Sequence, residues 1–305
     1  MEMRTLGKTG LRVSRLGAGL VEIGQFSIDE VQQAGRILGV ALDAGINFLD
    51  TAECYANSEE LIGLTVGHRR GEFVLATKAG HVSTGSSGQP WTGTTVRRGI
   101  DQSLKKLRTD RVDLVQVHAY DISAPPPDDV IEAVMDAKEA GKTRFVGYSG
   151  ENEDAEWAIE SGLFDTLQIS FNLVDQRPRY GIFERARERG MGIIAKRPIA
   201  NAVWGKATST GDAGLSGTSL ERLRRARALL EPGPIAESPK DLIALSLGFV
   251  LAHEDVHTAI VGTRDPEHML ANIDTIERQL PLAHRTVADL HERYDRMGRE
   301  WRGID

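Results

Sequence analysis

The chain has 305 residues, of which about 40% are hydrophobic and 27% charged, as is ordinary for a globular protein. Lys and Arg number 37 against 44 Asp and Glu, so the formal net charge is −7. This acidic balance, without a long basic run, disfavours nucleic acids and anionic membranes as partners. The one cysteine excludes an internal disulfide and a Cys-based zinc site. With no signal peptide and no apolar run of transmembrane length, a cytoplasmic protein is expected.

Short apolar runs alternate with segments of helical periodicity along almost the whole chain. Such runs are typical of parallel strands buried on both faces. The expected strands are Arg15–Leu20, Asn47–Asp50, Phe73–Lys78, Leu114–His118, Phe145–Ser149, Leu167–Ser170, Gly192–Lys196 and Thr258–Val261. Eight such units predict one α/β domain over residues 1–305, a closed (β/α)8 TIM barrel. An open doubly wound sheet is the competitor, and the lack of a GxGxxG motif after the first strand counts against it.

Three segments fall outside the strand–helix repeat. Residues 3–15 carry a Gly-Lys-Thr-Gly turn between two extended runs, and they predict a hairpin under the barrel. Residues 201–240 form a long insertion after the seventh strand, ending in a basic helical stretch near 220–230. Insertions of this length are usually lids or binding loops. Residues 282–299 predict one more polar helix.

Polar side chains end three consecutive strands. Asp50, Lys78 and His118 close the second, third and fourth runs, and Tyr55 follows Asp50 in the next loop. Taken singly, each has a structural explanation, such as a helix cap, a solvated strand end or packing. In a TIM barrel, however, all four converge at the C-terminal mouth, where the chemistry of such barrels lies.

These four residue types suit the reduction of a carbonyl group. Tyrosine is a weak acid with a pKa near 10, and a nearby Lys78 ammonium is expected to lower that pKa. An ionised Asp50 would keep Lys78 charged. Tyr55 then becomes a proton donor to a developing alkoxide, and His118 orients the same oxygen.

The chain resembles the aldo-keto reductase family in an ordered set of motifs. The segments are DTAECY (50–55), NSEELIG (57–63), ATK (76–78), DLVQVH (113–118) and GKTRFVGYS (141–149). The resemblance runs from the N-terminal hairpin to about Asn272. It implies a catalytic tetrad of Asp50, Tyr55, Lys78 and His118, and a nicotinamide cofactor bound without a Rossmann unit.

The resemblance also implies a set of cofactor-binding positions. Ser149 and Gln168 match residues that hold the nicotinamide carboxamide, and Gly150 replaces the usual Asn, leaving water or Glu151 to take its place. The whole set is Gly19, Asp50, Ser149, Gly150, Gln168, Lys196, Arg197, Pro198, Ile199, Gly262, Thr263, Arg264, His268 and Asn272. Arg264 favours NADPH over NADH, because a guanidinium can bind the 2′-phosphate with two hydrogen bonds.

The function expected is NADPH-dependent reduction of a small aldehyde or ketone, with no metal. Substrate determinants are placed in residues 79–93, 119–127 and 201–240, and neither the substrate nor the oligomeric state is readable. Three alternatives stay open. They are a Schiff-base aldolase using Lys78 or Lys196, a cofactor-sensing accessory subunit with little turnover, and a metal-dependent hydrolase.

Overall fold

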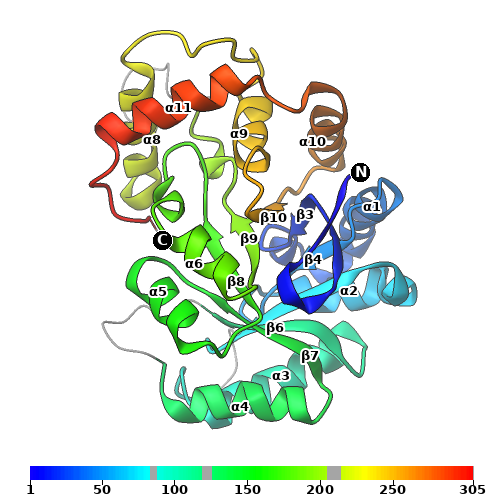
Figure 1. The fold of residues 1–305 in the computed structure, drawn as a ribbon. Coiled ribbons are helices and arrows are strands. Elements are labelled where there is room, and N and C mark those ends of the chain that lie inside the picture. The colour runs from blue at the N-terminus through cyan, green and yellow to red at the C-terminus, as the bar shows by residue number, and fades with distance from the viewer. Residues whose placement is uncertain (83–87, 119–125, 205–213, 305) are drawn as a thin grey trace.

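Eight parallel strands close into a barrel at the centre of the computed structural model (Figure 1), which describes residues 1–82, 88–118, 126–204 and 214–304. The strands are β3 (Leu16–Gly19), β4 (Phe48–Asp50), β5 (Val74–Ala79), β6 (Val112–His118), β7 (Thr143–Ser149), β8 (Thr166–Ser170), β9 (Gly192–Lys196) and β10 (Val256–Val261). They neighbour one another in chain order, and β10 pairs with β3 to close the ring. The predicted (β/α)8 fold is therefore confirmed.

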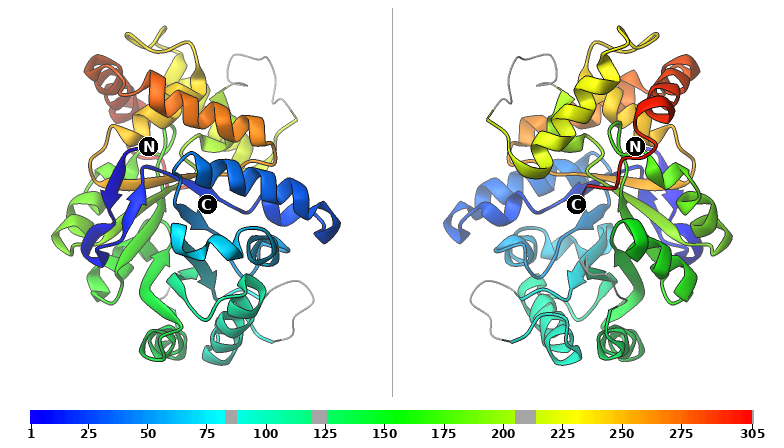
Figure 2. Two further views of the ribbon diagram at one scale, coloured as in Figure 1. Left: turned by 90° about the vertical axis from the view of Figure 1, so that its right-hand side faces the viewer. Right: turned by 90° about the vertical axis from the view of Figure 1, so that its left-hand side faces the viewer.

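Helices surround the strands on the outside, as the two side views show (Figure 2). They are α1 (Val31–Asp43), α2 (Ser58–Thr65), α3 (Gly93–Leu107), α4 (Asp128–Glu139), α5 (Asn152–Ser161), α6 (Ile182–Glu188), α8 (Gly217–Leu230), α9 (Leu242–Leu251), α10 (Pro266–Gln279) and α11 (His284–Met297). Most of these helices bury an apolar stripe against the barrel or against a neighbouring helix. In α3, for example, Val96, Ile100 and Leu107 are buried, and Thr92 caps the first turn by accepting a hydrogen bond from Thr95 N.

The N-terminal hairpin closes one end of the barrel, as predicted. Strand β1 (Met3–Thr5) pairs antiparallel with β2 (Arg12–Ser14), and Gly7–Thr9 forms the turn. Leu6 and Val13 are fully buried in one cluster with Phe48 of β4 and other barrel residues. The hairpin thus covers the apolar interior at the end opposite the mouth.

The insertion after β9 contains the expected basic helix, α8, which lies beside the equally expected α11 (Figure 1). Two arginines of α8 are buried. Arg222 donates to the carbonyl oxygen of Ile304 at 3.1 Å, and the Arg225 guanidinium lies 5.0 Å from the centre of the Trp301 ring. The basic face of this helix therefore holds residues 301–304 against the barrel.

The strand register aligns the polar strand ends. Asp50 lies opposite Gly19 and Ala76, Lys78 opposite Gln116, and Ser149 opposite both His118 and Gln168. Because all eight strands are parallel, these side chains share one end of the barrel. Within the residues described, no helix is long and apolar enough to span a membrane.

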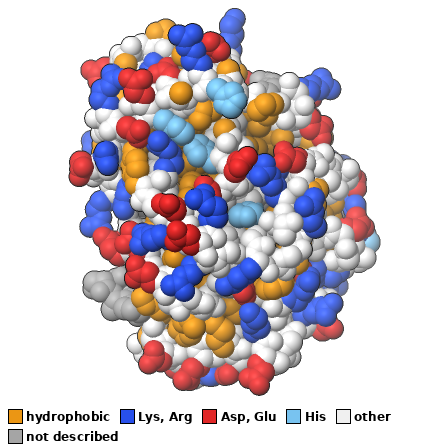
Figure 3. All heavy atoms as spheres, in the orientation of Figure 1, with side chains coloured by type: hydrophobic (Ala, Val, Ile, Leu, Met, Phe, Trp, Pro, Cys, Tyr) orange, Lys and Arg blue, Asp and Glu red, His pale blue; other side chains and the backbone are white. Residues whose placement is uncertain are grey.

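A pair of histidines joins the segment just after α9 to α11. Figure 3 shows histidine side chains gathered in the upper part of the face that it draws. His253 Nδ1 lies 2.8 Å from the Phe249 carbonyl oxygen and so carries a proton, which leaves His253 Nε2 to accept from His291 Nε2–H at 2.9 Å. Burial and the nearby Arg179 lower the pKa of His291 to about 4, and burial lowers the pKa of His253 to about 4 as well. The packed arrangement therefore requires both rings to be neutral.

Acid should loosen this contact. In the unfolded chain both imidazoles take up protons near pH 6.5, whereas the folded protein resists protonation until about pH 4, so stability is complete above pH 6.5 and is lost as the pH falls. We expect His291→Phe to reduce the drop in unfolding free energy between pH 7.5 and 5 by about 1 kcal/mol, which is half the value for a fully buried imidazole because His291 is partly exposed. Urea unfolding at both pH values measures this. His284→Gln, at an exposed position of the same helix, is the control and should leave the drop unchanged. Equal drops in wild type and His291→Phe would contradict the assignment.

Candidate active site

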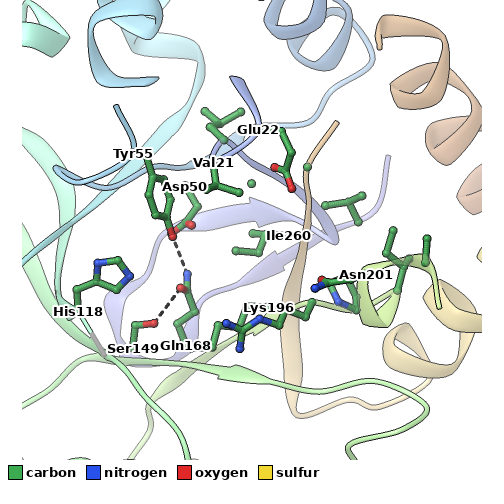
Figure 4. Close-up of a pocket in the computed structure, with 18 residues that line it drawn as sticks. Val21, Glu22, Asp50, Tyr55, His118, Ser149, Gln168, Lys196, Asn201 and Ile260 are labelled. Atoms are coloured by element: carbon green, nitrogen blue, oxygen red, sulfur yellow. Dashed lines mark hydrogen bonds between the residues drawn. The ribbon is translucent and has the colours of Figure 1, made fainter. Parts of the chain in front are cut away.

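The C-terminal ends of the strands surround a cavity of about 670 Å³ (Figure 4). It is lined by Gly19, Leu20, Val21, Glu22, Asp50, Tyr55, His118, Ser149, Gln168, Lys196, Arg197, Pro198, Ile199, Asn201, Ala202, Ile260, Val261 and Gly262. Most of the residues expected at the mouth thus share one cavity. Lys78 lies behind its wall.

A buried ion pair joins β4 to β5 under the cavity. Lys78 Nζ lies 2.6 Å from Asp50 Oδ2, and the two side chains are 1% and 2% exposed. Nζ also donates to the Thr51 carbonyl oxygen at 2.9 Å and to the Tyr55 hydroxyl at 3.4 Å. Burial opposes the charge on Lys78, but Asp50 and Tyr55 outweigh it and raise the Lys78 pKa. Lys78 therefore stays protonated, which argues against its use as a Schiff-base nucleophile.

Two glutamines satisfy the other oxygen of Asp50. Gln168 Nε2 donates to Asp50 Oδ1 at 2.8 Å and Gln116 Nε2 at 3.1 Å, while Ser149 Oγ donates to Gln168 Oε1 at 3.0 Å (Figure 4). Sequence reasoning missed Gln116. It lies two residues before His118 on β6 and so faces the same side, a period-two signal that would have found it.

Tyr55 points its hydroxyl into the cavity from the loop between β4 and α2. The loop passes close to Gly24, where an added Cβ would fall 2.1 Å from the Tyr55 carbonyl oxygen. Our expectation that Lys78 lowers the Tyr55 pKa is wrong as a net effect. Burial raises that pKa, Asp50 adds to the rise, and Lys78 offsets only part of it. The phenol is therefore firmly protonated at neutral pH.

His118 completes the group on the same wall. Its ring centroid lies 5.8 Å from that of Tyr55 and 4.7 Å from that of His81, a residue that the sequence did not single out. Burial lowers the His118 pKa well below its ordinary value, and the charges of Lys78, His81, Lys196 and Arg197 lower it further. The imidazole is therefore neutral.

Lys196 and Arg197 form a cationic wall at the end of β9. Lys196 Nζ lies 3.2 Å from Glu151 Oε1, and Arg197 Nη1 donates to Ser170 Oγ at 3.0 Å. Glu151 also accepts a hydrogen bond from Ser170 N at 3.0 Å. The pairing with Glu151 argues against Lys196 as a Schiff-base nucleophile, as Asp50 does for Lys78.

The wall continues into an unusual backbone. Arg197, Ala200, Asn201 and Ala202 all have positive φ, between 48° and 57°. Left-handed non-glycine residues cost roughly 1–2 kcal/mol each and cluster where function requires them. This turn brings Asn201, the first residue of the insertion expected to contribute to the substrate pocket, to the cavity.

Of the five cofactor-binding residues expected after β10, only one lines the cavity. Gly262 lines the cavity, and an added Cβ there would fall within 1.8 Å of Glu22 Oε2, a buried carboxylate oxygen without a hydrogen-bond partner in the part of the chain described. Thr263, Arg264, His268 and Asn272 do not line the cavity. The exposed Arg264 guanidinium lies 4.8 Å from the centre of the Phe26 ring, Thr263 Oγ1 accepts from Asp265 N at 3.0 Å, His268 is exposed, and Asn272 is buried.

Two further expectations concern ligands and loops. No group of three or more His, Cys, Asp or Glu side chains able to hold a metal ion occurs among the residues described. The loops expected to determine the substrate fall partly outside the described residues, which break off at 83–87, 119–125 and 205–213. Of their described members, Trp91 packs against His81 with ring centroids 5.0 Å apart.

A closed (β/α)8 barrel supports many kinds of chemistry, and comparison with known proteins identifies the class. Residues 15–292 match the model of the aldo/keto reductase family. The chain is 31% identical over 288 residues to the uncharacterized oxidoreductase YqkF of Bacillus subtilis, with 90% of each chain covered. It superposes on the holo form of an aldo-keto reductase from Bacillus halodurans with a TM-score of 0.82 at 27% identity, covering 96% of each chain.

The chain therefore belongs to the aldo/keto reductase family, and the predicted family and oxidoreductase class are confirmed. It is also 27% identical over 322 residues, 95% of each chain, to a rice protein described as a probable voltage-gated potassium channel subunit beta. Enzymes and a channel subunit thus share this scaffold.

Breaking the buried ion pair from one side should be costly. Lys78→Met leaves the Asp50 carboxylate buried and unpaired, for which we expect a loss of about 3–5 kcal/mol in the free energy of unfolding. The double variant Lys78→Met/Asp50→Asn should regain most of that loss, because both charges are gone. Urea unfolding measures each value.

The matched control is Arg97→Met at the exposed Arg97–Asp136 pair, where the nitrogen–oxygen distance is 2.8 Å. This variant should cost less than about 1 kcal/mol. A cost for Lys78→Met no larger than that of the control would show that the buried pair is not a structural constraint.

Proposed function

We propose that this protein is an NADPH-dependent reductase of small aldehydes or ketones. The observation that carries the proposal is the Tyr55 hydroxyl, which faces the cavity while the buried Lys78–Asp50 pair lies behind it. The family match supports a nicotinamide cofactor and a carbonyl substrate. The greater similarity to the holo form of the Bacillus halodurans protein than to its apo form, with TM-scores of 0.82 and 0.76, is consistent with a site shaped for its cofactor.

The residues present fit a nicotinamide cofactor. Ser149 and Gln168 place a hydroxyl and an amide at the cavity wall, where they are hydrogen-bonded to each other at 3.0 Å. Both groups could hydrogen-bond a nicotinamide carboxamide. Lys196 and Arg197 supply positive charge for a pyrophosphate, and a cavity of about 670 Å³ is in the range of small-ligand sites. When bound, the cofactor supplies the hydride.

The protein's own residues supply the proton and the charge balance. A substrate carbonyl oxygen would accept hydrogen bonds from Tyr55 and His118, and Tyr55 would give its proton to the oxygen as negative charge develops there. The Lys78 ammonium, 3.4 Å from the Tyr55 oxygen, stabilises the phenolate that remains. Asp50 keeps Lys78 charged and in place. In the reverse direction, the same groups would take a proton from an alcohol.

A cofactor-sensing accessory subunit is the second candidate, favoured by the relative described as a potassium channel subunit. The same tetrad would then bind the cofactor with little turnover. Turnover rates with NADPH and a panel of aldehydes separate the two. Many rapid turnovers support the reductase, and tight NADPH binding with one slow turnover supports the sensor.

Tyr55→Phe should abolish most turnover. Removal of the proton donor is expected to lower kcat about 10²- to 10⁴-fold while the Kd for NADPH stays unchanged. Because the Tyr55 pKa is raised, wild-type reduction should persist through neutral pH and decline only above about pH 10, as the phenol ionises. Steady-state kinetics across pH and tryptophan-fluorescence titration measure both. Undiminished activity in Tyr55→Phe would refute the mechanism.

Arg264 should decide the cofactor. We expect wild type to bind NADPH more tightly than NADH, and Arg264→Gln to raise the Kd for NADPH about tenfold without changing that for NADH, since one charge-assisted contact to the 2′-phosphate is lost. Arg278→Gln, at an exposed position of α10, is the control. A wild-type preference for NADH would keep the reductase but overturn this role of Arg264.

A further inference from the structure

The only cysteine of the chain touches the imidazole of the active site. Cys54 immediately precedes Tyr55, and its Sγ lies 3.6 Å from His118 Nδ1, within hydrogen-bonding range for sulfur. The thiol is partly buried. One loop therefore delivers two groups to the site, the Tyr55 hydroxyl to the cavity and the Cys54 thiol to the ring beside it.

The direction of this hydrogen bond follows from the charge state of each group. Burial raises the pKa of the Cys54 thiol, with Lys78 offsetting only part of the rise, so sulfur keeps its proton at neutral pH. His118 is neutral and carries one proton on its two nitrogens. Sulfur is a weak acceptor, whereas a bare imidazole nitrogen is a good one, so the thiol donates to Nδ1.

We propose that Cys54 is a positioning residue that fixes His118 in the tautomer protonated on Nε2. This inference rests on the proposed carbonyl reduction. With Nδ1 engaged by the thiol, Nε2–H is the polar group that His118 has left for the cavity it lines. The opposite tautomer would direct a nitrogen lone pair at the lone pairs of a substrate oxygen.

The surroundings of His118, as far as the structure describes them, disfavour a doubly protonated ring as the source of a donor at Nε2. A doubly protonated ring would donate from both nitrogens, but burial and four cationic or basic side chains oppose that charge, namely those of Lys78, His81, Lys196 and Arg197. The neutral ring must therefore carry its single proton on Nε2. Among the residues that the structure describes, Cys54 is the group within hydrogen-bonding range of Nδ1, so it favours this tautomer.

The tautomer can be read directly in the cofactor-free protein. Long-range ¹H–¹⁵N NMR distinguishes a protonated from a bare ring nitrogen, and His118→Asn identifies the His118 signals. We expect Nε2–H alone in wild type and a mixture with Nδ1–H in Cys54→Ala. Nδ1–H in wild type, or an unchanged spectrum in Cys54→Ala, would overturn the proposal.

Kinetics test whether the tautomer matters for turnover. Cys54→Ala should lower kcat for carbonyl reduction about tenfold with the Kd for NADPH unchanged, and Cys54→Ser, which keeps an O–H donor at this position, should regain part of that loss. A kcat for Cys54→Ser no better than that for Cys54→Ala would show that only packing is at stake, and would overturn the positioning role. If wild type reduces no carbonyl at all, the proposed function fails, and the NMR spectra still decide the tautomer.

Discussion

The mouth of the barrel is organised around the buried ion pair of Lys78 and Asp50. Removing two charges from water costs several kcal/mol for each ion, and the structure offsets this only because nearly every polar atom of the pair is satisfied. Gln116 and Gln168 donate hydrogen bonds to the second oxygen of Asp50. The Thr51 carbonyl oxygen and the Tyr55 hydroxyl accept hydrogen bonds from Lys78. The pair itself lies on β4 and β5, and these partners come from β6, β8 and one loop. The site therefore depends on the alignment of four barrel strands.

Much of this site is predictable because, in a parallel barrel, the place of a residue along its strand determines the end of the barrel at which it lies. A polar residue that ends an apolar run must lie at the mouth, which is how Asp50, Lys78 and His118 emerge from sequence alone. The sign of the net shift in the Tyr55 pKa does not emerge that way. It depends on how deeply the phenol is buried and on its distances to Asp50 and Lys78, and no sequence pattern contains those magnitudes.

The loops are less predictable because their contacts depend on segments that are distant in the sequence. Arg197 sits on a left-handed backbone, and besides Ser170 and Glu151 its guanidinium donates to the carbonyl oxygen of Ile304, more than a hundred residues away. The residue type and motif position of Arg264 predict a contact with a phosphate. They do not predict its contact with Phe26, which lies in the segment after β3. Such contacts join loops by tertiary packing, and local periodicity carries no trace of them.

The buried Lys78 ammonium also gives Tyr55 and His118, the two hydrogen-bond donors at the cavity, different properties. Lys78 stabilises negative charge on Tyr55, and the same positive charge helps to keep His118 from becoming an imidazolium. A phenol beside an ammonium can lose a proton and recover it, whereas a neutral imidazole can only offer a hydrogen bond. Tyr55 is thereby suited to transfer the proton and His118 to orient the acceptor, although both face the same cavity. The asymmetry arises from one lysine and from the carboxylate that keeps it charged.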